Sequence, residues 1–306
     1  MADLEKTLRG IEEEALETLK LLLRMQSVSS DSTKREDLER CGRFLEKLLK
    51  DWGFSTQWIY AQGYGSLVSE AEGKKEPTLL FYGHYDVQPA LKEDGWTNPP
   101  FEPVIQSGAI VCRGASDDKG QLVAFLYGLE AYRRTYGSFP CRVRILLEGA
   151  EEIGSPGFEE VLREKAELIH ADFAIVADCG RPVPERPAII CGFRGLAYLE
   201  VTVSGPKTDL HSGTFGGTVD NPAQVLSGML AALKDSHRRI AVPGFYDDVV
   251  PPTEQELREI EEVPFDEEEY RKSLGVPQLA GEEGYGTLVR RWLRPTLDIN
   301  LSLIHI

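Results

Sequence analysis

Long hydrophobic runs, paired cysteines and clusters of basic residues are all scarce in this sequence of 306 residues. No apolar run approaches the roughly 20 residues that a membrane-spanning helix needs. The 5 cysteines are widely scattered, odd in number and include no C-x-x-C pair, which favours free thiols in a reducing compartment. The acidic start, MADLE, lacks the basic and apolar regions of a signal peptide. These absences predict a cytoplasmic protein that makes no contact with membranes.

Basic residues are outnumbered by acidic ones, which argues against one class of partner. The chain has 34 Lys and Arg against 50 Asp and Glu, a net charge of −16. A nucleic-acid-binding protein normally presents a basic face, so we expect no nucleic-acid partner. The hydrophobic fraction of 42% and the charged fraction of 27% are ordinary for a folded globular protein. The length suggests about two domains.

The first part of the chain alternates between helical and β-like patterns. Apolar residues at helical spacing predict one helix from Leu4 to Met25. A second helix is predicted to begin at Thr33, where Glu36 completes a capping box, and to end near Gly53. Further patterns follow in alternation: strands at 57–60, 66–69, 78–82, 142–147 and 173–176, and helices from 120 onward and at 158–168. This alternation predicts an α/β fold with a largely parallel mixed sheet flanked by helices.

A proline-rich stretch divides the sequence. Three prolines fall within RPVPERP at 181–187, where neither a helix nor a central strand can continue, so we expect a domain boundary there. Beyond it, residues 188–204 resemble a pair of strands, and a helix is predicted from Ala223 to Lys234. The acidic segment 251–269 indicates a solvated helical face.

Acidic residues and histidines gather where predicted strands end. His84 and Asp86 follow the strand at 78–82, and a spacing of two places them on one side of an extended chain. They fit either a metal-binding imidazole with its orienting carboxylate or a polar turn after a buried strand. Asp117 and Asp118 precede a helix, where they fit either helix capping or a carboxylate that bridges two cations.

Two more acidic sites follow strands further along the chain. Glu151 and Glu152 come just after the strand at 142–147, and Asp178 follows the strand at 173–176. Two adjacent glutamates can divide their work, one binding metal and the other taking a proton from water, although a solvated acidic turn has the same composition. Ligands of open α/β sheets gather beyond the carboxyl ends of the strands, so all four sites can converge.

The order H-x-D, S-D-D-K-G, E-E-x-G-S and a strand-end Asp is far more specific than any one of these motifs. With it, the sequence resembles the M20 family of metallopeptidases, close to the carnosinase-like dipeptidase branch. The segments that carry this resemblance to the branch are YGHYDVQPA (82–90), GWTNPPFEP (95–103) and DLHSGTFGG (209–217). The resemblance extends from the first helix to Asn300.

The resemblance implies a role for each residue at the strand ends. His84 and Asp178 would hold one metal ion, Asp117 would bridge to a second, and Glu152 would bind that second ion. Glu151 would be the general base, and Asp86 would orient His84. Asp118 is not expected to be a ligand, and the family implies a cis peptide bond after Asp117. The two ions are expected to be Zn²⁺, with Mn²⁺ or Co²⁺ as alternatives.

The family also implies a zinc-peptidase-like catalytic domain interrupted by an α+β lid that mediates dimerisation. We expect 1–188 to be the first part of the catalytic domain and 189–306 to be a partial lid. His211 would reach the substrate carbonyl oxygen from the lid of the partner subunit in a homodimer. Without the resemblance, a lone histidine in a Gly-rich turn such as His211 indicates a surface residue. His237 is interpreted as an ordinary cation near the end of a helix.

Two features depart from the family pattern. M20 enzymes are longer, and the segment that returns to the catalytic domain brings the last histidine ligand of the second metal. That ligand has no counterpart here, because the context of His305 does not match. Residues 301–306, LSLIHI, resemble the translation of a transposon-end adapter from sequencing libraries. We therefore expect the natural chain to continue after Asn300.

Together these observations predict metal-dependent hydrolysis of dipeptides or similar short amides. Two metal ions would activate a water molecule, and Glu151 would take its proton. Two alternatives remain open: another M20 amide hydrolase, such as an aminoacylase or a desuccinylase, or a catalytically dead fragment that acts in dimerisation or ligand binding.

Overall fold

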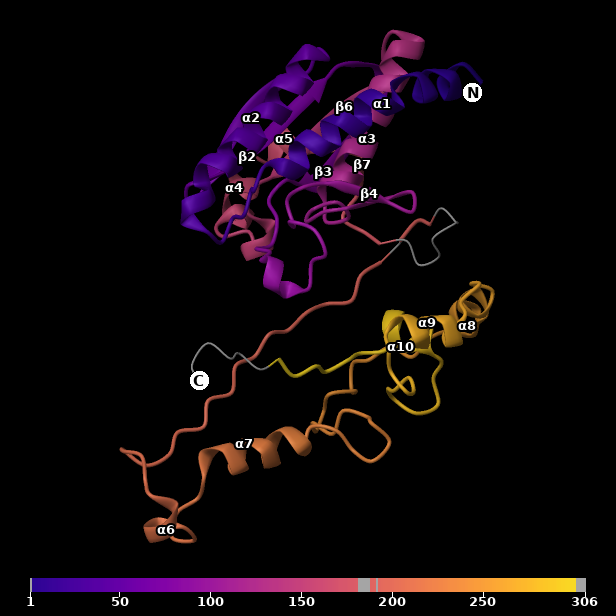
Figure 1. Cartoon of the computed structure of the whole chain (residues 1–306). Coiled ribbons are helices and arrows are strands. Elements are labelled where there is room, and N and C mark those ends of the chain that lie inside the picture. Colours follow the sequence, from indigo (N-terminus) through magenta and orange to yellow (C-terminus); the bar gives the residue numbers. More distant parts are fainter. Residues whose placement is uncertain (1, 181–187, 191, 301–306) are drawn as a thin grey trace. The chain divides into compact units, whose positions relative to one another are not determined.

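A computed structural model describes residues 2–180, 188–190 and 192–300 of the chain. The chain divides into two compact units, Met1–Gly180 and Arg181–Ile306, which are coloured from indigo through orange to yellow along the sequence in Figure 1. The predicted boundary near residue 188 falls beside the proline-rich stretch 181–187, which lies outside the described residues, as do residues 301–306.

The first unit is built on a five-stranded mixed sheet with the order β1-β2-β6-β3-β7. Its strands are β1 (Ser55–Ala61), β2 (Tyr64–Ala71), β3 (Gly73–His84), β6 (Phe139–Glu148) and β7 (Phe173–Val176). β3 pairs in parallel with β6 and β7, whereas β1, β2 and β6 are joined by antiparallel pairings. The predicted mixed α/β sheet is confirmed, and the parallel strands β6-β3-β7 form the part of it that leads to the acidic motifs.

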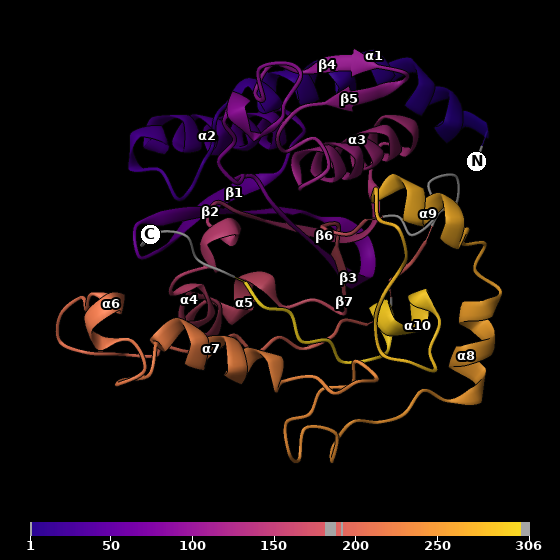
Figure 2. The same ribbon diagram turned by 60° about the horizontal axis from the view of Figure 1, so that its bottom comes forward.

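Three long helices cover one face of this sheet: α1 (Ala2–Arg24), α2 (Arg35–Asp51) and α3 (Lys119–Tyr136). Their apolar stripes form one core with the inward residues of the strands. Fully buried members of this core are Leu22, Leu45 and Leu126 from the helices and Phe81 and Ile145 from the strands. Burying such stripes supplies most of the stability of amphipathic helices. In Figure 2, α2 and α3 lie above the sheet.

The predicted capping box at the start of α2 is wrong. A 3-10 turn, η1 (Ser32–Lys34), precedes the helix, and Asp31 caps this turn. The Asp31 carboxylate accepts hydrogen bonds from the backbone N–H and the hydroxyl of Thr33, at 2.9 and 2.7 Å. The Thr33 hydroxyl therefore donates to Asp31 and does not accept the backbone N–H of Glu36. Lys34 occupies the N-cap position of α2 itself and forms no side-chain capping hydrogen bond there.

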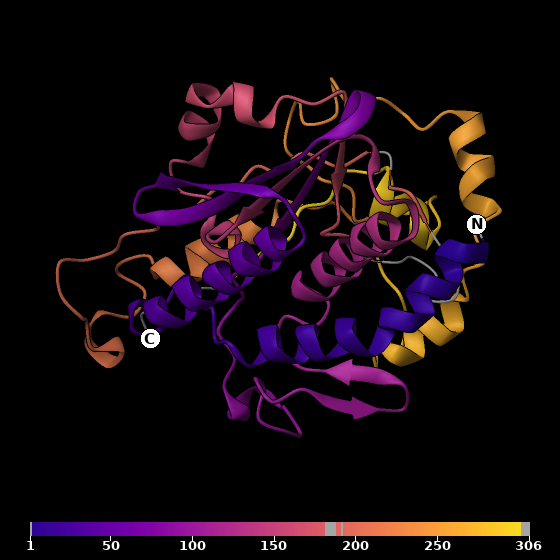
Figure 3. The ribbon, with the colours of Figure 1, turned by 90° about the horizontal axis from the view of Figure 1, so that it is seen from above.

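Two short helices, α4 (Phe158–Glu164) and α5 (Ala166–Ile169), cover the opposite face of the sheet, and Figure 2 shows them below it. Phe158 packs there with Ile59, Val68 and Leu146 in a second, smaller core. The predicted single helix at 158–168 is thus interrupted at Lys165, which lies between the two. The hairpin of β4 (Val104–Gln106) and β5 (Ala109–Val111) lies beside α1 in Figures 2 and 3, where Arg24 forms a 2.8 Å ion pair with Glu102.

The described part of the second unit combines short helices with long irregular segments. It contains α6 (Ser212–Phe215), α7 (Pro222–Ala231), α8 (Glu254–Glu261), α9 (Glu267–Ser273) and α10 (Thr287–Trp292). The helix predicted at 223–234 and the exposed helical character of 251–269 are confirmed by α7, α8 and α9. The pair of strands predicted at 188–204 is wrong for the described residues 188–190 and 192–204. Leu196 and Leu199 are 92% and 86% exposed there, so no sheet buries the apolar pattern that suggested strands.

Cys41, Cys112, Cys141 and Cys179 are free thiols, as predicted; Cys191 is not among the described residues. Among the described residues, no helix is both long and apolar enough to cross a bilayer.

Candidate metal centre

Acidic side chains and one histidine meet beyond the carboxyl ends of the parallel strands. His84 is the last residue of β3, Glu151 and Glu152 lie in the 3-10 turn η3 (Glu151–Ile153) after β6, and Asp178 follows β7. Asp117 precedes α3, whose first residue is Lys119. Parallel strands end at one edge of a sheet, which brings together the motifs that follow β3, β6 and β7. The loop before α3 adds Asp117 to them.

The distances among these side chains are those of a ligand cluster. Nε2 of His84 lies 3.0 Å from Oδ1 of Asp117 and 3.8 Å from Oδ2 of Asp178. Two overlapping groups share the imidazole: His84 with Asp117 and Glu152, and His84 with Glu151 and Asp178. Within each group the candidate ligand atoms all lie within 4.8 Å of one another. All predicted metal ligands are thus brought to one place, with Glu151 among them.

Asp86 is fully buried, and its carboxylate contacts both His84 and the glutamate turn η3. Its Oδ1 accepts the backbone N–H of Glu151 at 3.2 Å, and its Oδ2 accepts that of Glu152 at 3.1 Å. Nδ1 of His84 lies 3.4 Å from Oδ1 of Asp86 and 3.1 Å from its backbone oxygen. The contact with His84 is the one expected from the sequence. The contacts with the glutamate turn were not expected.

These contacts orient the imidazole. Since Nδ1 faces two oxygens of Asp86, it acts as the hydrogen-bond donor, and Nε2 is the nitrogen that faces Asp117 and Asp178. Burial lowers the pKa of His84, but the carboxylates of Asp86, Asp118 and Asp178 outweigh it and raise the pKa to about 10. In the metal-free site the imidazole is therefore protonated at neutral pH. It places a positive charge among the surrounding carboxylates.

The charge of the cluster suits divalent cations. Burial and the surrounding carboxylates raise the pKa of Glu151, Glu152 and Asp178. His84 partly offsets this rise, and for Glu152 the hydrogen bond from Gln88 offsets it more. Among the described residues, no Lys or Arg forms an ion pair with these three or with Asp117. Carboxylate oxygens and a neutral imidazole nitrogen are ligands that Zn²⁺ and Mn²⁺ accept in proteins. The residues present therefore fit the divalent ions that the motifs imply.

Asp118 has a different position from Asp117. The peptide bond between them is cis, as expected. The Asp118 side chain is buried, and its Oδ2 accepts the backbone N–H of His84 at 3.2 Å. Burial raises the pKa of Asp118 to about 7, against the opposing effect of His84. Asp118 thus supports the end of β3 and belongs to neither ligand group, in keeping with the expectation that it is not a ligand.

The next residue, Lys119, is almost completely buried and links this loop to the first helix. Its ammonium donates to the carbonyl oxygens of Leu22 and Met25, at 2.9 Å each. Leu22 lies in the last turn of α1, where backbone carbonyls lack helical partners. Burial lowers the pKa of Lys119.

Two groups near the centre were missed by the sequence analysis. The Gln88 backbone N–H donates to Oε1 of Glu152 at 3.1 Å, and its Nε2 donates to Oε2 at 2.8 Å and to the Glu152 backbone oxygen at 3.0 Å. The Tyr82 hydroxyl donates to Oε2 of Glu148 at 2.8 Å. Both Gln88 and Tyr82 lie in the segment YGHYDVQPA, which carried the family resemblance, but nothing in the sequence identified their partners.

His211 lies in the second unit, where it is exposed at the N-terminus of α6. Its role in a partner's site stays a prediction.

Comparisons with known proteins agree with this geometry. Residues 80–264 match the profile of Peptidase family M20/M25/M40. The Beta-Ala-His dipeptidase of Rattus norvegicus is 39% identical over 228 residues, which are 74% of this chain and 46% of that protein. The Cys-Gly metallodipeptidase of Schizosaccharomyces pombe is 35% identical over 226 residues, 73% of this chain and 48% of that protein. The chain spans about half the length of the curated relatives it matches.

Solved structures are similar over more of the chain. A di-peptidase from Saccharomyces cerevisiae has a TM-score of 0.77 and 26% identity, and the match covers 98% of this chain and 66% of that one. Human carnosine dipeptidase 1 has a TM-score of 0.72 and 28% identity, covering 91% of this chain and 62% of that one.

Proposed function

The chain belongs to peptidase family M20/M25/M40, and from this we propose that it is a metal-dependent hydrolase of dipeptides or similar short amides. The observation that carries the proposal is the pair of overlapping ligand groups around His84, with Glu151 inside one of them. A hydrolase of this kind needs cation ligands and a base within reach of the same water molecule. The first unit supplies both from strand ends of one sheet.

We propose that His84 and Asp178 hold one ion, that Glu152 holds a second, and that Asp117 bridges them. When bound, the ions would supply Lewis acidity toward water and toward the substrate carbonyl. Zn²⁺ fits the one-imidazole, carboxylate-rich ligand set, and Mn²⁺ and Co²⁺ are the alternatives. The single histidine contributes Nε2, because Asp86 engages Nδ1.

The two adjacent glutamates have different surroundings, which supports different roles. Gln88 donates to both carboxylate oxygens of Glu152 and so fixes that carboxylate in place. Glu151 has its backbone N–H held by Asp86, and no hydrogen bond to its carboxylate is found among the described residues. Its pKa is raised by burial and by neighbouring carboxylates. A carboxylate that is free to move and has a raised pKa suits a general base that takes a proton from water and returns it to the leaving amine.

The substrate class and the assembly are also proposals. The relatives are named as dipeptidases for Beta-Ala-His and Cys-Gly, and a short peptide with free ends is the substrate class we propose here. His211 would approach the scissile carbonyl oxygen from the lid of a partner subunit in a homodimer, where a donor would stabilise the oxyanion. A cytoplasmic location fits the scattered free thiols.

Metal content and turnover together test the proposal. The purified chain, dialysed against Zn²⁺ or Mn²⁺, is expected to retain metal, and a His84→Ala variant is expected to lose most of it. Hydrolysis of a dipeptide panel should disappear with a chelator and return when metal is restored. A chain that retains no more metal than its His84→Ala variant would contradict the metal centre. A chain that binds metal but hydrolyses no dipeptide or acylated amino acid would favour the ligand-binding alternative.

A further inference from the structure

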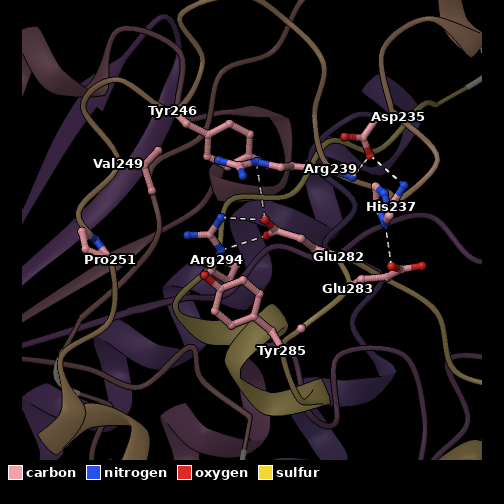
Figure 4. A pocket seen from close by; sticks show the side chains of 11 residues that line it. Asp235, His237, Arg239, Tyr246, Val249, Pro251, Glu282, Glu283, Tyr285 and Arg294 are labelled. Atoms are coloured by element: carbon pink, nitrogen blue, oxygen red, sulfur yellow. Dashed lines mark hydrogen bonds and ion pairs between the residues drawn. The ribbon is translucent and has the colours of Figure 1, made fainter.

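The second unit contains a cavity of about 790 Å³ that the proposed reaction does not use. Figure 4 shows it from close by. Two segments of the described chain line it, one within residues 235–251 and the other within residues 282–294. Its volume lies in the range of small-molecule sites, which runs from about 300 to 1,000 Å³. The polar groups on its walls decide what it can bind.

One wall consists of two arginines that share a carboxylate. Nε and Nη2 of Arg294 donate to the two carboxylate oxygens of Glu282, at 2.8 and 2.7 Å. Arg239 approaches the same carboxylate from its other side, with Nε at 4.0 Å. The Tyr246 ring lies 4.3 Å from the Arg239 guanidinium, and the Tyr285 ring lies 4.6 Å from that of Arg294. The aromatic rings thus hold both guanidinium groups in fixed planes.

This wall retains unused hydrogen-bond donors. Arg294 is only 5% exposed, and among the described residues its Nη1 has no hydrogen-bond partner, because Glu282 engages only Nε and Nη2. In Figure 4 this third nitrogen points away from Glu282, on the side of Pro251. The Arg239 side chain is 54% exposed, so its guanidinium is reachable from the cavity. Two arginines with one internal carboxylate leave this wall with a net charge of about +1.

The other wall is acidic. Nδ1 of His237 lies 2.7 Å from Oε2 of Glu283. Oδ1 of Asp235 accepts the backbone N–H groups of His237 and Arg239, at 2.9 Å each. In the described chain the second oxygens of Asp235 and Glu283 have no such partner. Figure 4 shows these carboxylates on the opposite side of the cavity from Pro251.

We propose that this cavity binds the zwitterionic form of a free α-amino acid. The carboxylate of the ligand would lie against the guanidinium of Arg239, and its ammonium against the free oxygens of Asp235 and Glu283. Arg294 would add positive charge to the Arg239 wall without contacting the ligand. The side chain would contact Val249 and Pro251, which also line the cavity. A charge-assisted hydrogen bond at each end gives both orientation and affinity.

The charge balance selects a zwitterion over an anion. Arg239 and Arg294 share the cavity with the three carboxylates of Asp235, Glu282 and Glu283, so it offers no excess positive charge to a phosphate or another dianion. A zwitterion adds no net charge and matches a site that is positive at one wall and negative at the other. Amino acids are also the products of the proposed hydrolysis. Binding itself does not depend on that activity.

The test compares L-leucine with two analogues that each lack one charged end. Saturation-transfer NMR on the whole chain, with EDTA present so that no metal ion recruits the ligand, gives a Kd for each compound. Leucine is expected to bind saturably. We expect 4-methylpentanoate, which lacks the ammonium, and 3-methylbutylamine, which lacks the carboxylate, each to bind at least about tenfold more weakly. Equal binding of leucine and either analogue would overturn the proposal, and so would no saturable leucine signal.

A matched pair of variants locates the site. Arg239→Gln is expected to weaken leucine binding about tenfold. Arg238→Gln makes the same chemical change one residue away, outside the cavity lining, and is expected to leave the Kd unchanged. Equal effects of the two would refute the site. Should Arg239→Gln lose its circular-dichroism signature of folding, Glu283→Gln decides, because that side chain is 63% exposed. Undiminished leucine binding in Glu283→Gln would then refute the proposal.

Discussion

Gln88 holds Glu152 by hydrogen bonds to both oxygens of its carboxylate, at 3.1 and 2.8 Å. One of these bonds comes from the backbone and survives any substitution that keeps an N–H, whereas the other comes from the side-chain amide. The carboxylate of Glu152 is thus held in one orientation, whereas no hydrogen bond among the described residues orients the carboxylate of Glu151.

Gln88→Met should therefore lower metal affinity without removing a ligand. Loss of the amide donor frees the Glu152 carboxylate to rotate, and groups that orient ligands typically contribute about 10–100-fold to metal affinity. We expect a loss of about tenfold, measured by competition against a fluorescent chelator. Gln255→Met is the control, because Gln255 also donates to a glutamate, Glu259, but does so in α8 of the second unit. Equal affinities of the two variants would show that Gln88 does not orient Glu152.

The two glutamates should respond differently to the same isosteric change. Glu152→Gln is expected to reduce the metal bound per chain, because an amide oxygen is a weaker ligand than a carboxylate. Glu151→Gln is expected to keep metal and lose turnover, by about 10²–10⁴-fold for the removal of a general base. Metal analysis and dipeptide hydrolysis on both variants measure the contrast. Equal metal loss in both would refute the division of roles.

Metal affinity should fall as the pH is lowered. His84 is protonated in the metal-free site, since its pKa is raised to about 10, and a cation at Nε2 must displace that proton. At neutral pH, binding is therefore expected to release at least one proton. Calorimetric titration with Zn²⁺ in two buffers of different ionisation enthalpy measures the number directly. An enthalpy that is the same in both buffers would contradict the protonated state of His84.

Glu46 should stabilise the first unit in a pH-dependent way. Burial opposes its ionisation, but hydrogen bonds from Lys50 and Arg43 lower its pKa to about 2. A lowered pKa stabilises the fold fully above the unfolded value near 4.5 and progressively less as the pH falls toward 2. Glu46→Gln is expected to cost about 1–2 kcal/mol at pH 7, because both partners are more than half exposed.

Urea unfolding at pH 7 and at pH 3 measures that difference, which should shrink at the lower pH. The control is Glu13→Gln in α1, since Glu13 is exposed and forms no ion pair among the described residues. A Glu46→Gln penalty that is unchanged or larger at pH 3 would contradict the lowered pKa.

The predictable part of the site followed from topology. Residues such as His84 and Asp178 could be placed because a strand ends where its apolar pattern ends, and parallel strands end at one edge of a sheet. The hydrogen bonds of Gln88 and the second contact of Asp86 could not be predicted, because they depend on the paths of loops. The strands expected at 188–204 show the same limit: an apolar pattern indicates a tendency, but a strand exists only where a neighbouring strand accepts its hydrogen bonds.

Lys119 connects helix α1 to the candidate metal centre, although α1 contributes no ligand to that centre. Its ammonium donates hydrogen bonds to the carbonyl oxygens of Leu22 and Met25 and so joins the last turn of α1 to the residues that follow Asp117. Fraying of that helix would release a buried ammonium and, with it, the loop that carries Asp117. Shortening α1 at its N-terminus, or fusing a bulky partner that strains it, should therefore weaken metal binding. The affected site lies about a hundred residues further along the sequence.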